Sequence, residues 1–157
     1  MPPRPRGSFE TLDGQDASRA IASNLIGRNR MPSQGVRPGF QTVVPYLCAQ
    51  GAAQLVDFLK AAFGAERTFI APTGKHFEVK IGDSMVMIGE AGNGASQIGH
   101  IFMYVEEPEA MYRRAIEAGA TSVMEPCDRP WGEDEAIMRG AGVKDRAGNV
   151  WYLAGPK

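Results

Sequence analysis

The side chains most able to do chemistry in this chain are its two histidines, His76 and His100, and the acidic residue Glu78. His76 and Glu78 are separated by one residue in the run KHFEVKI at 75–81, which alternates polar and apolar residues as a β-strand does. Both side chains therefore share one face of the expected strand. With His100 they could form a facial set of two histidines and one carboxylate for a divalent metal. The alternative is that His76 belongs to a pocket wall and Glu78 pairs with Lys80 or an arginine.

The other reactive side chains form no recognisable catalytic motif. Cys48 and Cys127 stand outside any CxxC pattern, so neither a disulfide framework nor a zinc site is predicted. A nucleophilic cysteine needs an adjacent base or an electropositive site, and the sequence supplies neither to Cys48. The chain contains no Ser-His-Asp order, P-loop or glycine-rich nucleotide fingerprint.

Composition excludes several classes of function. The chain has 157 residues, of which 43% are hydrophobic and 22% charged, as expected for one globular domain with a real core. A net charge of −1 gives no reason to expect nucleic acid or an anionic membrane as a partner. No apolar stretch is long enough to span a membrane, and the first residues contain no apolar region of a secretory signal. A cytoplasmic protein is therefore expected.

The second half of the chain repeats the plan of the first half at a spacing of about 55 residues, and such a repeat decides the architecture. Residues 51–72 (GAAQLVDFLKAAFGAERTFIAP) and 107–126 (EPEAMYRRAIEAGATSVMEP) each combine a helical pattern, a Gly-Ala pair and a β-prone run ending in proline. A β-like run precedes each copy, at 42–49 and 99–106. Two such copies are expected to pair around a shared concavity, where a small molecule would bind.

Each copy is expected to form a strand, a helix and three more strands, which gives an α+β fold of two βαβββ modules. Module one, residues 40–90, has expected strands at 42–49, 66–71, 75–81 and 84–88 and a helix at 52–63. A linker at 91–98 leads to module two, residues 99–157. Its strands are expected at 100–105, 121–125, 136–144 and 150–154, and its helix at 108–118, with proline at the start.

Residues 1–39 differ from the rest of the chain and form an N-terminal extension rich in Pro, Arg, Gly, Ser and Asn. Within it, Ala17, Ile21 and Leu25 have the spacing of one short amphipathic helix. Because so short a helix is marginal in water by itself, we expect an arm that packs on its own domain or on a second subunit. A disordered tail is the alternative.

Six strings of the sequence, in this order, resemble the vicinal oxygen chelate superfamily, which includes glyoxalases, bleomycin resistance proteins and extradiol dioxygenases. They are VVPYL at 43–47, VDFLKAAFGAE at 56–66, GKHFEVKIGDSMVMIGE at 74–90, YVEEPEAMYRRAIEAGAT at 104–121, PWG at 130–132 and VKDRAGNVWYLA at 143–154. Within the superfamily, the chain resembles the PhnB-like branch of small bacterial proteins. The resemblance covers residues 40–155 and excludes the extension.

The resemblance implies two βαβββ modules that form a cupped mixed sheet, usually completed by dimerisation. In enzymes of the superfamily a divalent metal sits in the cup, held by side chains from the first and last strands of each module. Here His100 falls at one such position. The others fall at Val44 or Pro45, at Tyr152 and within 86–88, and none of these supplies a good ligand at neutral pH. The usual metal site is therefore expected to be lost, and no cofactor is expected. A divalent metal at His76, Glu78 and His100 stays open as the alternative.

With His100 facing the cup, alternation places Phe102 and Tyr152 on the inner face as well. Ile101 and Met103 are then expected on the opposite face, packed under the helices. The inner face is aromatic and sulfur-rich, a composition suited to a flat or apolar organic molecule. Trp131 lies in a connection at 126–139 that is longer than in relatives, where it could be a lid or anchor a dimer interface. A packed interior without a pocket is the alternative. The candidate ligand-binding residues are Tyr46, Cys48, His76, Glu78, Met87, His100, Phe102, Tyr104, Trp131, Arg139 and Tyr152.

The leading hypothesis for function is binding of a small organic molecule in this aromatic cup without the usual metal, by a protein that forms a homodimer. The second is a metal-dependent glyoxalase- or dioxygenase-like enzyme. A third is an interaction module in which the N-terminal arm matters most. The near-neutral charge gives little support to cationic bleomycin as the ligand.

Overall fold

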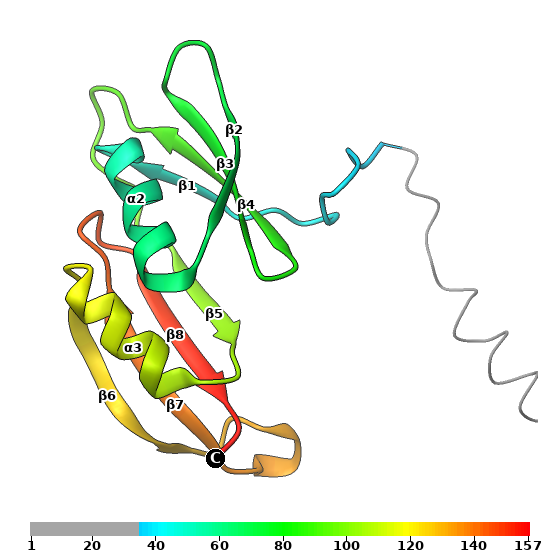
Figure 1. The fold of residues 1–157 in the computed structure, drawn as a ribbon, viewed down its shortest axis with the longest axis vertical. Coiled ribbons are helices and arrows are strands. Elements are labelled where there is room, and N and C mark those ends of the chain that lie inside the picture. Colours follow the sequence, from blue (N-terminus) through cyan, green and yellow to red (C-terminus); the bar gives the residue numbers. More distant parts are fainter. Residues whose placement is uncertain (1–34) are drawn as a thin grey trace, which may run out of the picture. The chain divides into compact units, whose positions relative to one another are not determined.

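One order of secondary structure occurs twice in the computed structural model, as the repeat predicted (Figure 1). The structure describes residues 35–157, and Arg37–Lys157 form one compact unit. The helix predicted around Ala17, Ile21 and Leu25 lies outside the described residues. Module one contains β1 (Tyr46–Ala49), α2 (Ala52–Phe63), β2 (Glu66–Ile70), β3 (His76–Ile81) and β4 (Ser84–Glu90). Module two contains β5 (His100–Tyr104), α3 (Pro108–Glu117), β6 (Thr121–Arg129), the 3-10 turn η1 (Glu133–Glu135), β7 (Met138–Lys144) and β8 (Val150–Gly155).

Each module folds into a four-stranded mixed sheet. The strand order is β1-β4-β3-β2 in sheet A and β5-β8-β7-β6 in sheet B. The first strand of each module runs parallel to the last, with Tyr46 opposite Met87 in sheet A and Phe102 opposite Tyr152 in sheet B. The other pairs of neighbouring strands are antiparallel. The predicted α+β class and the two βαβββ modules are confirmed.

Some strand boundaries differ from the prediction. β1 begins at Tyr46 and not at 42, because Pro45 has no amide proton to donate and Gln41 binds β4 through its side chain. Gln41 Nε2 donates to the Met85 carbonyl at 2.8 Å, and its Oε1 accepts from the Met85 amide at 3.0 Å. β6 continues past the predicted end at 125 through Pro126, which an edge strand tolerates where its register shifts. β7 begins at 138 and not at 136.

The two modules share one hydrophobic core. Each helix covers one face of its own sheet, and α2 and α3 also pack against each other (Figure 1). Trp151 on β8 is fully buried, and its ring centroid lies 5.0 Å from that of Phe63 at the end of α2. Arg114 on α3 donates to the carbonyl of Ala62 on α2 at 3.3 Å. Each helix therefore buries part of its surface against the other module. Among the described residues, no helix has both the length and the apolar character that crossing a membrane requires.

The carboxylate of Asp145 holds the turn between β7 and β8. It accepts hydrogen bonds from the backbone amide and the side-chain amide of Asn149 and from the indole Nε1 of Trp151, each at 2.9 Å. Asn149 in turn accepts from the Gly99 amide at 2.9 Å, next to the start of β5. Asp145 and Asn149 are both buried, so this network connects the turn, the core tryptophan and the first strand of module two.

The N-terminus of α2 is capped by a side chain from the end of β4. The two carboxylate oxygens of Glu90 accept from the amides of Gly51 and Ala52, each at 2.9 Å. Gly51 has a φ of 78°, a left-handed conformation that suits glycine. The amides of Ala52 and Gly51 lower the pKa of Glu90, because they stabilise its charged form.

Glu90→Gln is expected to lower the melting temperature at pH 7 and to have progressively less effect as the pH falls. Since the pKa of Glu90 is lower in the folded than in the unfolded chain, its charge stabilises the fold above the ordinary glutamate pKa of about 4.3. That contribution is lost as the pH falls through the lower pKa of the folded state. Thermal unfolding between pH 7 and pH 3 measures the effect. Glu66→Gln, an exposed position on β2, is the control. A constant difference between wild type and Glu90→Gln over this range would contradict the prediction.

Candidate functional site

The predicted site residues occupy mainly the sheet faces that the helices leave uncovered, and they form two groups. Sheet A carries Tyr46, Cys48, His76, Glu78 and Met87, and sheet B carries His100, Phe102, Tyr104 and Tyr152, joined by Trp131 from the loop after β6. The residues that alternate with them, such as Leu47, Val79 and Leu153, belong to the core. Within residues 35–157, the ring contacts of these side chains join residues of one sheet only.

On sheet A, the ring of Tyr46 extends from β1 across β4 towards β3. Its hydroxyl lies 3.4 Å from Nδ1 of His76, and the two rings are stacked with centroids 5.7 Å apart. Gly89 on β4 makes this possible, because a Cβ added there would lie 2.4 Å from the Tyr46 hydroxyl. Tyr46 remains 53% exposed, so its hydroxyl lies on an open face.

Glu78 is buried on the same face, at 4% exposure, and both of its carboxylate oxygens face a cation or a possible proton donor. Oε2 forms a salt bridge with Arg37, and Oε1 lies 3.6 Å from Nε2 of His76. Arg37 also lies over the ring of Phe40, 4.0 Å from its centroid. The pairing of Glu78 with an arginine, which the sequence left open, is therefore present. It comes from residue 37, inside the predicted extension.

On sheet B, Phe102, Tyr104, Trp131 and Tyr152 form a cluster that we call the aromatic face. The ring of Phe102 contacts those of Tyr104 and Trp131 edge to face, with centroids 5.2 and 5.3 Å apart. Trp131 and Tyr152 meet in the same way at 6.1 Å. Such edge-to-face contacts are the favoured geometry for aromatic pairs. Phe102 and Tyr104 remain 45% and 74% exposed, so the aromatic face is open to solvent.

Two glycines of β7 form the floor beneath these rings. A Cβ added at Gly140 would lie 2.6 Å from the ring of Trp131, and one added at Gly142 would lie 3.4 Å from the ring of Tyr152. The indole of Trp131 therefore packs directly against the backbone of β7, within the aromatic face. The absence of a side chain at Gly140 allows the indole to approach the sheet this closely.

The metal that the resemblance implies does not fit the side chains brought together in one chain. His100 is exposed on β5, opposite Val150, whereas His76 and Glu78 belong to sheet A. Within residues 35–157, no three His, Cys, Asp or Glu side chains come close enough together to hold a metal ion. The set of His76, Glu78 and His100 is therefore not assembled in the described part of one chain.

Arg139 lies apart from the other candidate residues. Its guanidinium binds Glu109 of α3, with Nε 2.7 Å from Oε1, and Asp128 of β6 at 3.1 Å. These two carboxylates raise the pKa of Arg139. Hydrogen bonds from Lys157 and Arg139 lower the pKa of Asp128. Arg139 thus belongs to a cluster of ion pairs on the helix side of β7.

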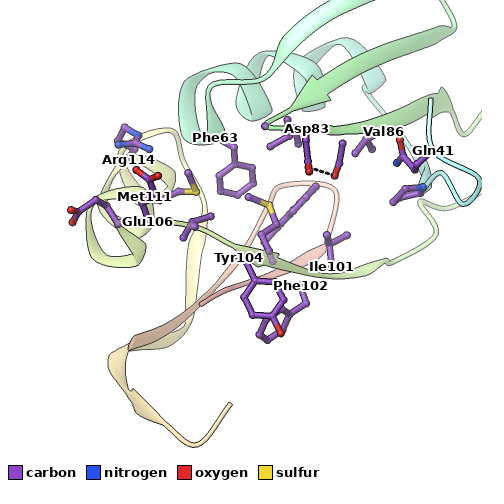
Figure 2. A pocket seen from close by; sticks show the side chains of 18 of the residues that line it. Gln41, Phe63, Asp83, Val86, Ile101, Phe102, Tyr104, Glu106, Met111 and Arg114 are labelled. Atoms are coloured by element: carbon purple, nitrogen blue, oxygen red, sulfur yellow. Dashed lines mark hydrogen bonds between the residues drawn. The ribbon is translucent and has the colours of Figure 1, made fainter. Parts of the chain in front are cut away.

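An apolar groove of about 890 Å³ lies between the β3–β4 hairpin of module one and β5 of module two. Phe63, Val86, Ile101 and Met111 line it, with Arg114 and Glu106 also on its wall. Figure 2 shows the rings of Phe102 and Tyr104 projecting from β5 on the side opposite Ile101. Phe102 and Tyr104 nevertheless also border the groove, so the groove and the aromatic face meet at β5. Ile101 and Met103, which are predicted to pack under the helices, line this groove, which the sequence does not predict.

The sequence reasoning also missed Arg37, Gly89, Gly140 and Gly142. The glycines leave no mark on a hydrophobic pattern, although glycine inside a strand is itself a sign of close approach by another group. Gly140 and Gly142 alternate in the run RGAGVK, and this spacing was the available signal. Arg37 had no local signal, because its partner Glu78 is distant in the chain.

Comparison with known proteins gives one family and one fold. The sequence model of the Glyoxalase/Bleomycin resistance protein/Dioxygenase superfamily matches residues 40–153. None of the curated proteins is significantly similar in sequence.

Several solved structures have the same fold. TioX from Micromonospora sp. ML1 has a TM-score of 0.63 and 23% identity, over 74% of this chain and 99% of that one. The fosfomycin resistance protein FosX from Listeria monocytogenes has a TM-score of 0.57 and 18% identity, over 74% of this chain and 93% of that one. A lactoylglutathione lyase from Agrobacterium tumefaciens has a TM-score of 0.55 and 19% identity, over 76% and 96%.

Proposed function

Since the chain belongs to the Glyoxalase/Bleomycin resistance protein/Dioxygenase superfamily, we propose that it binds a small planar organic molecule at the aromatic face, without a bound metal. The observation that carries this proposal is the cluster of Phe102, Tyr104, Trp131 and Tyr152 on a glycine floor. A continuous aromatic surface open to solvent is typical of a binding site, because water solvates it poorly. We assign the chain to the PhnB-like branch on its six sequence strings.

Stacking on these rings would favour a flat ligand over a flexible one. Each ring can offer its face or its edge, so a planar aromatic molecule gains contact area without ordering a flexible side chain. The metal-free part of the proposal rests on the donor set, since Tyr152 stands where the superfamily's enzymes have a carboxylate. Cys48 and Cys127 are both free thiols, which is compatible with the cytoplasmic location expected from the sequence.

The ligand would need a second wall, because the aromatic face of one chain is open. We propose that a homodimer supplies it, with sheet A of a partner protomer lying opposite the aromatic face. Tyr46, Cys48, His76 and Met87 would then belong to the same site as Phe102 and Tyr152, as the sequence reasoning expected.

The test is binding of naphthalene-, quinoline- and anthraquinone-type compounds, measured by fluorescence and calorimetry. Trp151 is fully buried, whereas Trp131 is partly exposed on the aromatic face, so a bound ligand is expected to quench mainly Trp131. Phe102→Ala is expected to weaken binding by about tenfold or more, through loss of one aromatic contact worth about 1.4 kcal/mol. Chelator in the buffer is expected to have no effect.

The control is Ile116→Ala, because Ile116 is also exposed, at 36%, but lies on α3 and not on either uncovered sheet face. A smaller loss than for Phe102→Ala supports the aromatic face as the main contact. Loss of binding on addition of chelator would instead favour a metal-dependent enzyme. If none of the compounds binds and Phe102→Ala changes the sedimentation coefficient, the aromatic face is a protein interface and the proposal is wrong.

A further inference from the structure

Tyr46, His76 and Glu78 form a continuous chain of polar contacts on the uncovered face of sheet A. The hydroxyl of Tyr46 lies 3.4 Å from Nδ1 of His76, and Nε2 of His76 lies 3.6 Å from Oε1 of Glu78. The second carboxylate oxygen of Glu78 is held by Arg37. Tyr46 comes from β1, His76 and Glu78 come from β3, and Arg37 comes from the segment before β1. Together they form a series of acid–base groups on the uncovered face of sheet A.

The direction of proton donation follows from the chemistry of these groups. An ionised carboxylate can only accept hydrogen bonds, so His76 can donate to Glu78 only with a proton on Nε2. In a neutral imidazole, Nδ1 then has a free lone pair and accepts from the Tyr46 hydroxyl. Because Glu78 is buried and ion-paired with Arg37, it stays in place to orient the imidazole. This arrangement, an outer hydroxyl, a base and a third group that orients the base, is the one that activates nucleophiles and proton donors in enzymes.

Gly89 gives the contact between Tyr46 and His76 a structural explanation. Its missing side chain leaves the space through which Tyr46 reaches across β4, and its backbone conformation would accept alanine. An alanine there would displace the Tyr46 ring from His76 without removing any titratable group. One added methyl group at position 89 is therefore expected to break the contact between Tyr46 and His76.

We propose that Tyr46, His76 and Glu78 form a proton-transfer relay, in which the Tyr46 hydroxyl exchanges a proton with a ligand on the face of sheet A. The ligand class is a carbonyl compound with an acidic C–H bond beside the carbonyl, or an enol or phenol. The inference goes beyond the proposed binding function and uses no residue of the aromatic face. The tests below use the protein without any ligand at the aromatic face, so failure of the relay and failure of ligand binding there are distinguishable.

The step balances without any other reactant. As the ligand gives a proton to Tyr46 Oη, the original phenolic proton moves to Nδ1 of His76. The products are a ligand anion and an imidazolium, which Glu78 stabilises through Nε2. In the reverse direction the ligand anion takes up one proton. If the proton returns to the same atom, hydrogen is exchanged with the protein. If it goes to a different atom, the ligand is isomerised. Contacts of 3.4 and 3.6 Å to His76 fit this role, because catalytic hydrogen bonds often shorten only when the ligand binds.

The first test is the rate at which p-toluenesulfonyl fluoride labels the tyrosines, followed by peptide mass spectrometry. In this reaction the phenolic oxygen bonds to sulfur, the S–F bond breaks, fluoride leaves and the phenolic proton passes to the base. Tyr104 is the internal control, because it is 74% exposed against 53% for Tyr46. Exposure alone would make Tyr104 react faster than Tyr46. The relay is instead expected to make Tyr46 react at least about tenfold faster than Tyr104. This lower bound is smaller than the rate increase that a general base usually gives.

Variants separate the relay from simple accessibility. Gly89→Ala and His76→Gln are each expected to reduce the rate of Tyr46 labelling below that of Tyr104. His100→Gln, whose imidazole belongs to sheet B, is expected to leave Tyr46 labelling unchanged. Faster labelling of Tyr104 than of Tyr46 in the wild type, or an unchanged Tyr46 rate in Gly89→Ala, would overturn the proposal.

A second measurement does not depend on labelling or on the folding of a relay variant. The His100→Gln protein contains one histidine, so its imidazole nitrogen spectrum reports His76 alone. The relay requires the neutral imidazole to carry its proton on Nε2. A spectrum showing the proton on Nδ1 would overturn the relay, whereas failure of the aromatic compounds to bind would leave this result untouched.

Discussion

Replacing Asp145 with alanine is expected to lower the free energy of unfolding by about 4 kcal/mol, because it leaves buried donors without an acceptor. The carboxylate accepts three hydrogen bonds of 2.9 Å from Asn149 and Trp151. Trp151 is fully buried, so water cannot replace the lost acceptor without entering the core. Asn149 would also lose its orientation towards Gly99, and with it the link to β5.

Urea unfolding, followed by the fluorescence of the buried tryptophan, measures this effect. The internal repeat supplies a matched control, Asp83→Ala, in the corresponding hairpin turn between β3 and β4. Asp83 is exposed, and within residues 35–157 its side chain accepts only from the neighbouring Ser84 hydroxyl. Its loss is therefore expected to cost no more than about 0.5 kcal/mol. Equal losses for the two variants would show that the Asp145 network contributes little.

Gly155→Ala is expected to destabilise the protein by about 3 kcal/mol, through overpacking at the end of β8. A Cβ at Gly155 would lie 2.0 Å from the carbonyl oxygen of Val105 and 2.8 Å from the ring of Pro108. Val105 follows β5 and Pro108 is the first residue of α3, and a backbone carbonyl cannot turn aside as the end of a side chain can. The end of β8 would have to separate from these two residues.

Gly94→Ala is the control for Gly155→Ala, since the nearest atom to a Cβ at Gly94 is 3.4 Å away and the residue is exposed. Its effect is expected to stay within about 0.5 kcal/mol. Thermal and urea unfolding of the two variants measure the difference. A Gly155→Ala protein as stable as Gly94→Ala would mean that the start of α3 moves more easily than its packing indicates.

Two periodicities in the sequence accounted for the fold and for the faces of the strands. The repeat predicted the order of elements in both modules, and the alternation within KHFEVKI placed His76 and Glu78 on one face, as the structure shows. The same reasoning placed Phe102 and Tyr152 on one face of sheet B, where they lie opposite each other. Alternation is reliable here because one face of each sheet must be buried under a helix.

Features that depend on distant partners could not be predicted in this way. Any of the 17 lysines and arginines could have paired with Glu78, and the choice of Arg37 depends on how the chain before β1 crosses β4. The side of β7 on which Arg139 lies could not be predicted either. The residues of β7 that face the aromatic rings are glycines, which carry no side chain to identify that face. The groove beside β5 depends on how the two modules pack, and no periodicity within one module contains that information.

The shared core has a consequence for the origin of the chain. A protein made of one βαβββ module would leave exposed the helix surface that α2 and α3 cover for each other here. It would have needed a second copy of itself to shield that surface, placed much as the second module is placed now. Fusion of two such copies would have removed the concentration dependence of that pairing and freed each half to diverge. The different chemistry of the two uncovered faces, a hydroxyl–imidazole–carboxylate chain on one and stacked rings on the other, is what such freedom would produce.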